Sequence, residues 1–269
     1  MENKSKRKCQ PSAFQYCTAK FQKVDMGSVI LELPECQEKS LEAYEEIKED
    51  LEEGVIDDLE EKKRQKIQKK FWIKRYQLFS KFDQGIKLDY ESWFSVTPEK
   101  IARHIAERCK CKIIIDAFAG AGGNTINFAQ TCDRVIAIDI DPKKIDLARN
   151  NAKIYGVEHK IEFLIGDFFE LAPMLKADVV FLSPPWGGPS YINKSILNLE
   201  NIMSPHGGEK LLEQARKITK EIAYYLPKNI NKQQLAIAAG PNCKVEIESN
   251  YLDDKIIAKT AYYGNLLKV

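Results

Sequence analysis

Histidine is scarce in this sequence, and its cysteines lack the spacing of a metal site. The 269 residues include three histidines, all isolated, and seven cysteines, of which only Cys109 and Cys111 lie close together. No second pair stands at zinc-site spacing, so we expect no metal. The sequence also shows no secretory signal peptide, and we expect reduced thiols in an intracellular compartment.

Long apolar runs are missing as well. None reaches the roughly 18 residues of a membrane-spanning helix, so we expect no membrane partner. With 44% hydrophobic and 30% charged residues, the composition is that of a globular protein. The net charge of +2 conceals two blocks, because residues 1–60 carry 8 Lys or Arg and 15 Asp or Glu, whereas residues 61–112 carry 15 and 6. The basic block suggests an anionic partner.

Three parts are predicted from these charge blocks. Residues 1–60 form an acidic, partly disordered N-terminal region, in which 39–60 is either a solvated helix or a linker. It includes the basic cluster from Lys4 to Lys8, which could be a nuclear import signal. Residues 61–110 form a basic, aromatic helical extension, and residues 111–269 form the main domain. The eight aromatics between positions 71 and 94 suit a nucleic-acid surface, packing against the core, or both.

Apolar branched segments alternate with helical periodicity along the main domain, which favours a parallel sheet covered by helices. The predicted strands are 112–116, 134–139, 161–165, 178–182 and 222–226, followed by a closing antiparallel pair at 245–248 and 256–263. The predicted helices are 98–108, 124–130, 142–155, 168–175, 208–221 and 232–239. Thr97 is the expected N-cap of the first helix, with Pro98 at its first position. The fold class is therefore α/β, with a seven-stranded, mostly parallel, Rossmann-like sheet.

The loop from Asp116 to Asn124 follows the first predicted strand and is rich in small residues. Small residues allow a close backbone approach to a ligand, and Asp139, at the end of the second strand, can hold both ribose hydroxyls of a nucleoside. A dinucleotide fingerprint needs a third glycine where this chain has Thr125. An Asp at the loop's start repels pyrophosphate but can pair with an amino or sulfonium centre, so we favour S-adenosylmethionine. Asp167, after the third strand, could accept from the adenine amino group or cap a helix.

The stretch from Ser183 to Pro189 follows the fourth strand and resembles the [N/D/S]-P-P-[Y/F/W] signature of enzymes that methylate exocyclic amino groups. Two prolines hold the Ser183 hydroxyl and the Pro184 carbonyl rigidly. Hydrogen bonds to these oxygens would localise the lone pair of a ring amino group, and Trp186 would hold the base flat. Taken alone, the stretch could equally be a proline-rich loop with a packing Trp. Together with the three upstream motifs, it follows the order of a class I methyltransferase.

Several longer motifs make the resemblance specific. They are 75–83, 85–89, 93–100, 116–118, 139–142 and 183–189. In this order they resemble the trimethylguanosine synthase family over residues 70–265. The resemblance implies two successive methyl transfers from S-adenosylmethionine to the exocyclic amino group of a 7-methylguanosine cap, on small nuclear and nucleolar RNAs. It also implies that 111–269 is the catalytic domain and that 61–110 contributes to both ligand sites.

The resemblance also assigns the site residues. The catalytic set is Ser183, Pro184 and Trp186. The cofactor set is Phe94, Thr97, Asp116, Phe118, Ala119, Gly120, Asn124, Thr125, Asp139, Ile140, Asp167, Phe168 and Ser183. The substrate set is Lys87, Trp186, Tyr191, Lys228 and Asn229. Relatives commonly carry Arg at the position of Lys228, so bidentate phosphate contact is lost there.

Two other hypotheses remain. One is an amino-methyltransferase acting on adenine or on a protein amide, which predicts no preference for a 7-methylated, cationic base. The other is a non-catalytic cap-binding or scaffold module, which predicts loss of Asp116, Asp139 or Ser183, and all three are present. For the cap enzyme we expect a monomer, ribonucleoprotein proteins as further partners, and a location in the nucleus, in the nucleolus or Cajal body, with the cytoplasm as a second location.

Overall fold

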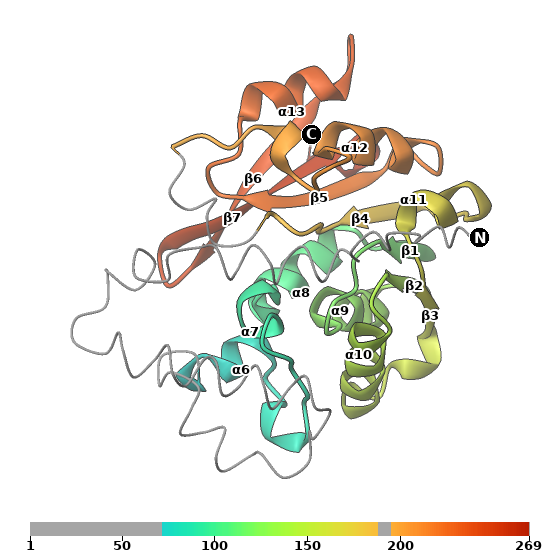
Figure 1. The fold of residues 1–269 in the computed structure, drawn as a ribbon, viewed down its shortest axis with the longest axis vertical. Helices are drawn as coiled ribbons and strands as arrows, with labels where there is room; N and C mark the ends of the chain where they lie inside the picture. The colour runs from blue at the N-terminus through green and yellow to red at the C-terminus, as the bar shows by residue number, and fades with distance from the viewer. Residues whose placement is uncertain (1–71, 188–194, 269) are drawn as a thin grey trace, which may run out of the picture.

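A seven-stranded mixed sheet forms the centre of the molecule (Figure 1). The structure is a computed structural model and describes residues 72–187 and 195–268. The strands are β1 Ile113–Asp116, β2 Arg134–Asp139, β3 Ile161–Ile165, β4 Val179–Leu182, β5 Ile222–Pro227, β6 Val245–Leu252 and β7 Lys255–Tyr263. Their order is β3-β2-β1-β4-β5-β7-β6, and within the described sheet β7 alone runs in the direction opposite to the other six strands. The predicted α/β class and strand count are confirmed.

Helices cover both faces of the sheet (Figure 1). One face carries α8 Glu99–Arg108, α9 Gly123–Thr131 and α10 Pro142–Tyr155, and the other α11 Phe168–Leu171, α12 Gly208–Arg216 and α13 Lys232–Ala239. Adjacent β1 residues point to opposite faces, so Ile114 packs with Phe128 of α9 and Ile115 belongs to the cluster that includes Leu211 of α12. The central strands are buried on both faces, as parallel strands usually are.

The predicted extension packs directly on this core. Its described elements are α6 Arg75–Leu78, a 3-10 helix at Phe82–Gln84 and α7 Ser92–Ser95. Phe79 and Phe82 are buried in a cluster with Ile126 of α9 and Ala152 of α10. Inward packing of the aromatics is therefore confirmed for these two rings, whereas Tyr76 and Phe94 remain 45% and 39% exposed.

Asn151 of α10 ties the extension to the core. The Asn151 side chain is fully buried. Its Oδ1 accepts from the Lys87 N–H at 2.8 Å, and its Nδ2 donates to the carbonyls of Lys87 and Ala121, both at 2.9 Å. One side chain thereby satisfies both backbone groups of Lys87, so that the loop before α7 has a defined position beside the loop after β1.

Three helix ends differ from the sequence-based expectation, and β6 extends to Leu252, beyond the predicted end at residue 248. Thr97 does not cap α8, because Pro98 occupies the N-cap position and the Thr97 hydroxyl accepts from Asn124 instead. Helix α12 ends at Arg216, since the chain must turn toward β5, and the Thr219 hydroxyl binds the Asp178 carbonyl in that turn. Helix α11 ends at Leu171 and continues as a 3-10 helix, Ala172–Met174, because Pro173 cannot donate to the α-helical ladder.

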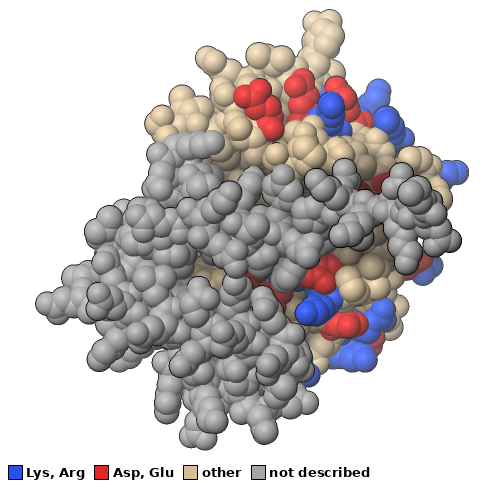
Figure 2. All heavy atoms as spheres, viewed as in Figure 1, with Lys and Arg blue, Asp and Glu red and all other residues tan. Residues whose placement is uncertain are grey.

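Some expectations fall outside the described residues. These are the acidic region 1–60, the basic cluster from Lys4 to Lys8, and Tyr191. Elsewhere, Figure 2 shows acidic and basic side chains interspersed over the described part of one face. None of the helices in the described parts of the chain has the length and apolarity to cross a membrane.

Candidate active site

The residues predicted to carry the chemistry meet at one edge of the sheet. Asp116 ends β1, Asp139 ends β2, and Ser183 directly follows β4. Asp116 pairs with Ala137 on one side and with Phe181 on the other. Ala137 lies two residues before Asp139, and Phe181 lies two residues before Ser183. Asp116, Asp139 and Ser183 therefore occupy neighbouring positions along this edge of the sheet. The strand order reverses between β1 and β4, which is where open α/β sheets bind ligands.

Asp116 is a fully buried carboxylate with one unsatisfied oxygen. Oδ2 accepts from the Thr125 hydroxyl at 2.6 Å, and Oδ1 is buried without a hydrogen-bond partner among the described residues. Burial raises the pKa of Asp116 to about 7, although hydrogen bonds from Thr125 and the Phe118 backbone act in the opposite direction. An orphaned buried carboxylate oxygen calls for a cationic or hydrogen-bonding ligand.

The glycine loop and Asp139 form a second set of backbone contacts. Gly120 and Gly122 have φ of +52° and +89°, and a Cβ on Gly122 would lie 3.1 Å from the Ala148 backbone. Asp139 Oδ2 accepts from the Gly120 N–H at 2.8 Å, and Oδ1 accepts from the Asp141 N–H at 3.0 Å. Burial raises the pKa of Asp139. Each oxygen keeps a second lone pair, so a ribose diol at Asp139 stays a prediction.

The chain contributes aromatic and apolar groups around this loop. Ala119 is buried and donates its N–H to the Ile138 carbonyl at 2.8 Å. Phe118 packs against Phe168 with ring centroids 6.3 Å apart, and the Phe168 ring is only 2% exposed, so it is a core residue. Ile140, which directly follows Asp139, is 44% exposed. Its apolar side chain is therefore available to a planar ring.

Asp167 acts as a helix cap in the structure. One of its carboxylate oxygens accepts from the Phe169 N–H at 2.8 Å at the start of α11. This is the capping alternative, and the second oxygen remains able to accept from an adenine amino group.

The extension supplies Phe94 and Thr97. The Thr97 hydroxyl accepts from Asn124 Nδ2 at 3.0 Å, which joins the segment after α7 to the first turn of α9. Asn124 Oδ1 is buried without a hydrogen-bond partner among the described residues. Phe94 packs edge-on against Tyr90, with ring centroids 5.3 Å apart, and still exposes 39% of its surface.

The motif after β4 stands beside the glycine loop. The Ser183 hydroxyl donates to the Phe118 carbonyl at 3.4 Å, a long contact that a ligand could replace. Pro184 is buried, as expected of a rigid support. Trp186 is half-buried and lies against Tyr225 of β5, with ring centroids 5.5 Å apart and planes inclined at 36°. Tyr225 is buried and supports the indole from one side.

Cations gather at the end of β5. Lys228 is exposed immediately after Pro227, the last residue of β5. Lys259 on β7 pairs with Leu226 and is only 8% exposed. Burial, and then the charges of Lys232 and Lys228, lower the pKa of Lys259, so both of these cations lie close enough to repel it. The Asn229 carbonyl accepts from the Leu197 N–H at 2.9 Å.

Sequence reasoning missed four contributors to this region, namely Lys144, Asn151, Tyr225 and Lys259. Lys144 reaches Asp89 of the extension, Asn151 supports Lys87, and Tyr225 supports Trp186. No local pattern marks any of them, because each acts through a partner far away in the chain.

The residues present fit S-adenosylmethionine. Asp116 Oδ1 has no hydrogen-bond partner among the described residues, and the ammonium or sulfonium group of the cofactor would supply a cation for it. The glycine loop allows a close backbone approach, Asp139 offers carboxylate oxygens, and Ile140 offers an exposed apolar surface.

A family model and two relatives agree with this chemistry, and one solved structure agrees in fold alone. Residues 111–265 match the family model described as RNA cap guanine-N2 methyltransferase. Trimethylguanosine synthase of Schizosaccharomyces pombe is 41% identical over 75% of this chain and 87% of that protein. Trimethylguanosine synthase of Saccharomyces cerevisiae is 37% identical over 66% and 61%. A solved structure from Porphyromonas gingivalis W83, assigned there as a methyltransferase, is similar in fold with a TM-score of 0.60, 13% identity, and coverage of 86% and 59%.

The buried Asp116 leads to a pH prediction. A cationic ligand prefers the ionised carboxylate, whereas the free protein holds the proton below the raised pKa of about 7. Affinity for S-adenosylmethionine should therefore fall about tenfold between pH 8 and pH 6 as Asp116 becomes protonated. Calorimetric titration at both pH values measures this fall.

Two variants complete this test. Asp116→Asn should bind more weakly and show no such pH dependence, whereas Asp133→Asn, at an exposed position before β2, should behave as the unmodified protein does. Equal affinity of the unmodified protein at the two pH values would contradict the role of Asp116.

Proposed function

Because the chain belongs to the RNA cap guanine-N2 methyltransferase family, we propose that it converts 7-methylguanosine caps to 2,2,7-trimethylguanosine. Two successive methyl transfers from S-adenosylmethionine to the exocyclic N2 amino group accomplish this conversion. The observation that carries the proposal is the placement of Ser183 to Trp186 at the end of β4, directly beside the Asp116 loop. The trimethylguanosine product is taken from the names of the two relatives. The double transfer is inferred from that product.

The protein's part in the chemistry is orientation and hydrogen bonding. S-adenosylmethionine, when bound, supplies an electrophilic methyl group on a positively charged sulfur. The Ser183 hydroxyl and the Pro184 carbonyl accept hydrogen bonds from the amino group, which localises its lone pair for in-line attack. Held by Asp116 and the glycine loop, the cofactor would give its methyl group to the nitrogen and keep the electron pair of the carbon–sulfur bond. The methylated nitrogen then loses a proton to solvent, so no strong base is required.

Trp186 selects for the cationic base in this proposal. Methylation at position 7 gives the base a positive charge, and stacking on indole then gains roughly 0.5–2 kcal/mol over neutral guanine. Tyr225 backs the indole, which limits the orientations available to it. Lys228 and Lys87 supply positive charge for the triphosphate bridge.

Substrate preference is the first test. With labelled S-adenosylmethionine, the protein should methylate 7-methylguanosine nucleotides in preference to unmethylated guanosine nucleotides, by a factor of about 2 to 30 from the cation–π difference alone. Mass spectrometry of the product should show two added methyl groups on N2. Equal transfer to both nucleotides would favour the general amino-methyltransferase.

Trp186 gives the second test. Trp186→Ala should lower kcat/KM for the capped nucleotide by about a hundredfold, the upper range of a lost stacking contact. Affinity for S-adenosylmethionine should stay measurable, and Trp186→Phe should recover part of the activity. An equal loss of cofactor binding, accompanied by a lower melting temperature, would identify Trp186 as a packing residue.

The RNA class and the location extend the proposal. We infer that capped small nuclear and nucleolar RNAs are the substrates and that the protein acts in the nucleus. The basic cluster from Lys4 to Lys8 supports nuclear import. A fluorescent fusion should accumulate in the nucleus, and replacing these basic residues with alanine should shift it to the cytoplasm. An unchanged distribution would remove the cluster as the import signal.

A further inference from the structure

The geometry points to Lys144 as a positioning residue for cofactor binding. Its contacts with Asp89, Glu91 and Ser92, here named the Lys144 latch, hold α7 and its Phe94 beside the cofactor loop. This inference rests on the proposed function only in taking S-adenosylmethionine as the ligand. None of the four latch residues is among the site residues that the resemblance assigns to either ligand.

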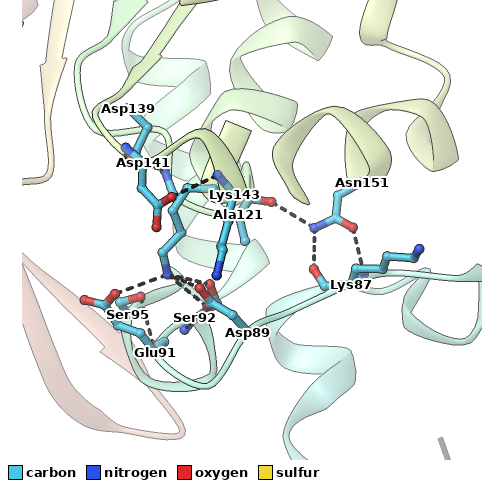
Figure 3. A network of polar contacts seen from close by, with 12 residues as sticks. Lys87, Asp89, Glu91, Ser92, Ser95, Ala121, Asp139, Asp141, Lys143 and Asn151 are labelled. Atoms are coloured by element: carbon cyan, nitrogen blue, oxygen red, sulfur yellow. Dashed lines mark hydrogen bonds and ion pairs between the residues drawn. The ribbon is translucent and has the colours of Figure 1, made fainter. Parts of the chain in front are cut away.

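Lys144 gathers several oxygens of one short segment, whose residues Asp89, Glu91 and Ser92 lie close together in Figure 3. Its Nζ lies 2.7 Å from Asp89 Oδ2, 3.2 Å from Glu91 Oε2 and 3.2 Å from the Ser92 hydroxyl. Asp89 Oδ1 also accepts from the Ser92 N–H at 2.9 Å, which orders the turn into α7. A single ammonium thus fixes three side chains at the start of the helix that carries Phe94.

The latch is buried and charged. The Lys144 side chain is only 7% exposed, and those of Asp89 and Glu91 are 22% and 28% exposed. Burial alone would lower the pKa of Lys144, but Asp89 and Glu91 raise it above its ordinary value. Burial would raise the pKa of Asp89, yet the Lys144 charge and hydrogen bonds bring it below its ordinary value. The pair therefore stays ionised, with little solvent to screen it.

The latch joins the extension to the start of α10, which follows Asp139. Lys144 is the third residue of α10, which begins three residues after Asp139. Asp141 caps this helix, because its carboxylate accepts from the Lys143 N–H at 2.9 Å. Burial raises the pKa of Asp139, and the positive charge of Lys144 offsets part of that rise. Movement of Lys144 would therefore change the electrostatic environment of Asp139, at the predicted ribose site.

The far end of the same segment is held separately. Thr97 binds Asn124 at 3.0 Å, and a Cβ on Gly123 would come within 3.0 Å of Val96, so the segment after α7 packs tightly on α9. Residues 89–97 are thus fixed at both ends, by α10 and by α9, with the half-exposed Phe94 between them. A buried ion pair adds little net stability compared with well-packed apolar residues, but removing one partner leaves the other charge buried and uncompensated. Because Asp89 and Glu91 both lie in the segment that leads into α7, we expect loss of Lys144 to loosen α7 more than the rest of the fold.

Lys144→Met tests the latch, because it removes the charge and keeps most of the side chain's length. In the full chain, the dissociation constant for S-adenosylmethionine should rise about tenfold, which is 1.4 kcal/mol. The KM for the capped nucleotide should change far less, since Lys87 is held by Asn151 rather than by the latch. Lys144→Arg should recover part of the affinity.

Hydrogen exchange provides a readout that needs no activity. The amides of Ser95 and Val96 bond to the carbonyls of Glu91 and Ser92 at 3.0 and 3.1 Å, and they should exchange faster in Lys144→Met. Exchange in β1 and β4 should stay unchanged. Lys143→Met, which alters the exposed neighbouring lysine, should leave cofactor affinity and exchange as they are.

The outcomes separate this inference from the proposed function. A folded Lys144→Met protein with unchanged affinity and unchanged exchange would overturn the latch. If that variant does not fold, Glu91→Gln decides, with a weaker effect in the same direction expected and no effect overturning the inference. Cofactor binding is measured without RNA, so a protein that methylates a different nucleophile would leave the latch intact while refuting the cap proposal.

Discussion

The burial of a carboxylate at the end of β1 is the constraint on which the site depends. Asp116 has no exposed surface and carries one oxygen without a partner among the described residues. Its charge is costly there, as the raised pKa shows. Thr125 and the Phe118 backbone stabilise the ionised form only in part, so a cationic ligand is the natural complement. The glycine loop, the start of α9 and the motif after β4 are all arranged around that position.

The extension completes the site because it shares a core with the sheet domain. Phe79 and Phe82 lie in the same buried cluster as residues of α9 and α10, so the aromatic half of the basic block serves packing. Asn151 and Lys144, both on α10, then fix the loop that precedes α7. The boundary proposed near residue 110 is accordingly a boundary in charge and composition, and the hydrophobic packing continues across it.

Much of the fold was predictable because its signals are local. Branched apolar runs give the buried parallel strands, and α10 has its expected ends because Asp141, Pro142 and Gly156 act as caps within the helix's own neighbourhood. The errors arose where tertiary contacts decide. Thr97 binds Asn124 rather than capping α8, and α12 stops early to let Thr219 reach Asp178. Family motifs named most of the candidate site, but Lys144 and Lys259 escaped because their partners are distant in sequence.

The two halves of the site differ in how they are assembled. The cofactor half uses consecutive segments, since Asp116, Gly120, Thr125 and Asp139 lie within 24 residues and are joined by direct hydrogen bonds. The substrate half draws on the extension, β4, β5 and β7, and it depends on their pairing. Lys259 stands near Lys228 only because β7 inserts antiparallel beside β5 with Lys259 opposite Leu226. A shift of one residue would turn Lys259 to the other face of the sheet. The antiparallel insertion thus sets the positive charge at the predicted substrate end independently of the loops that are predicted to hold the cofactor.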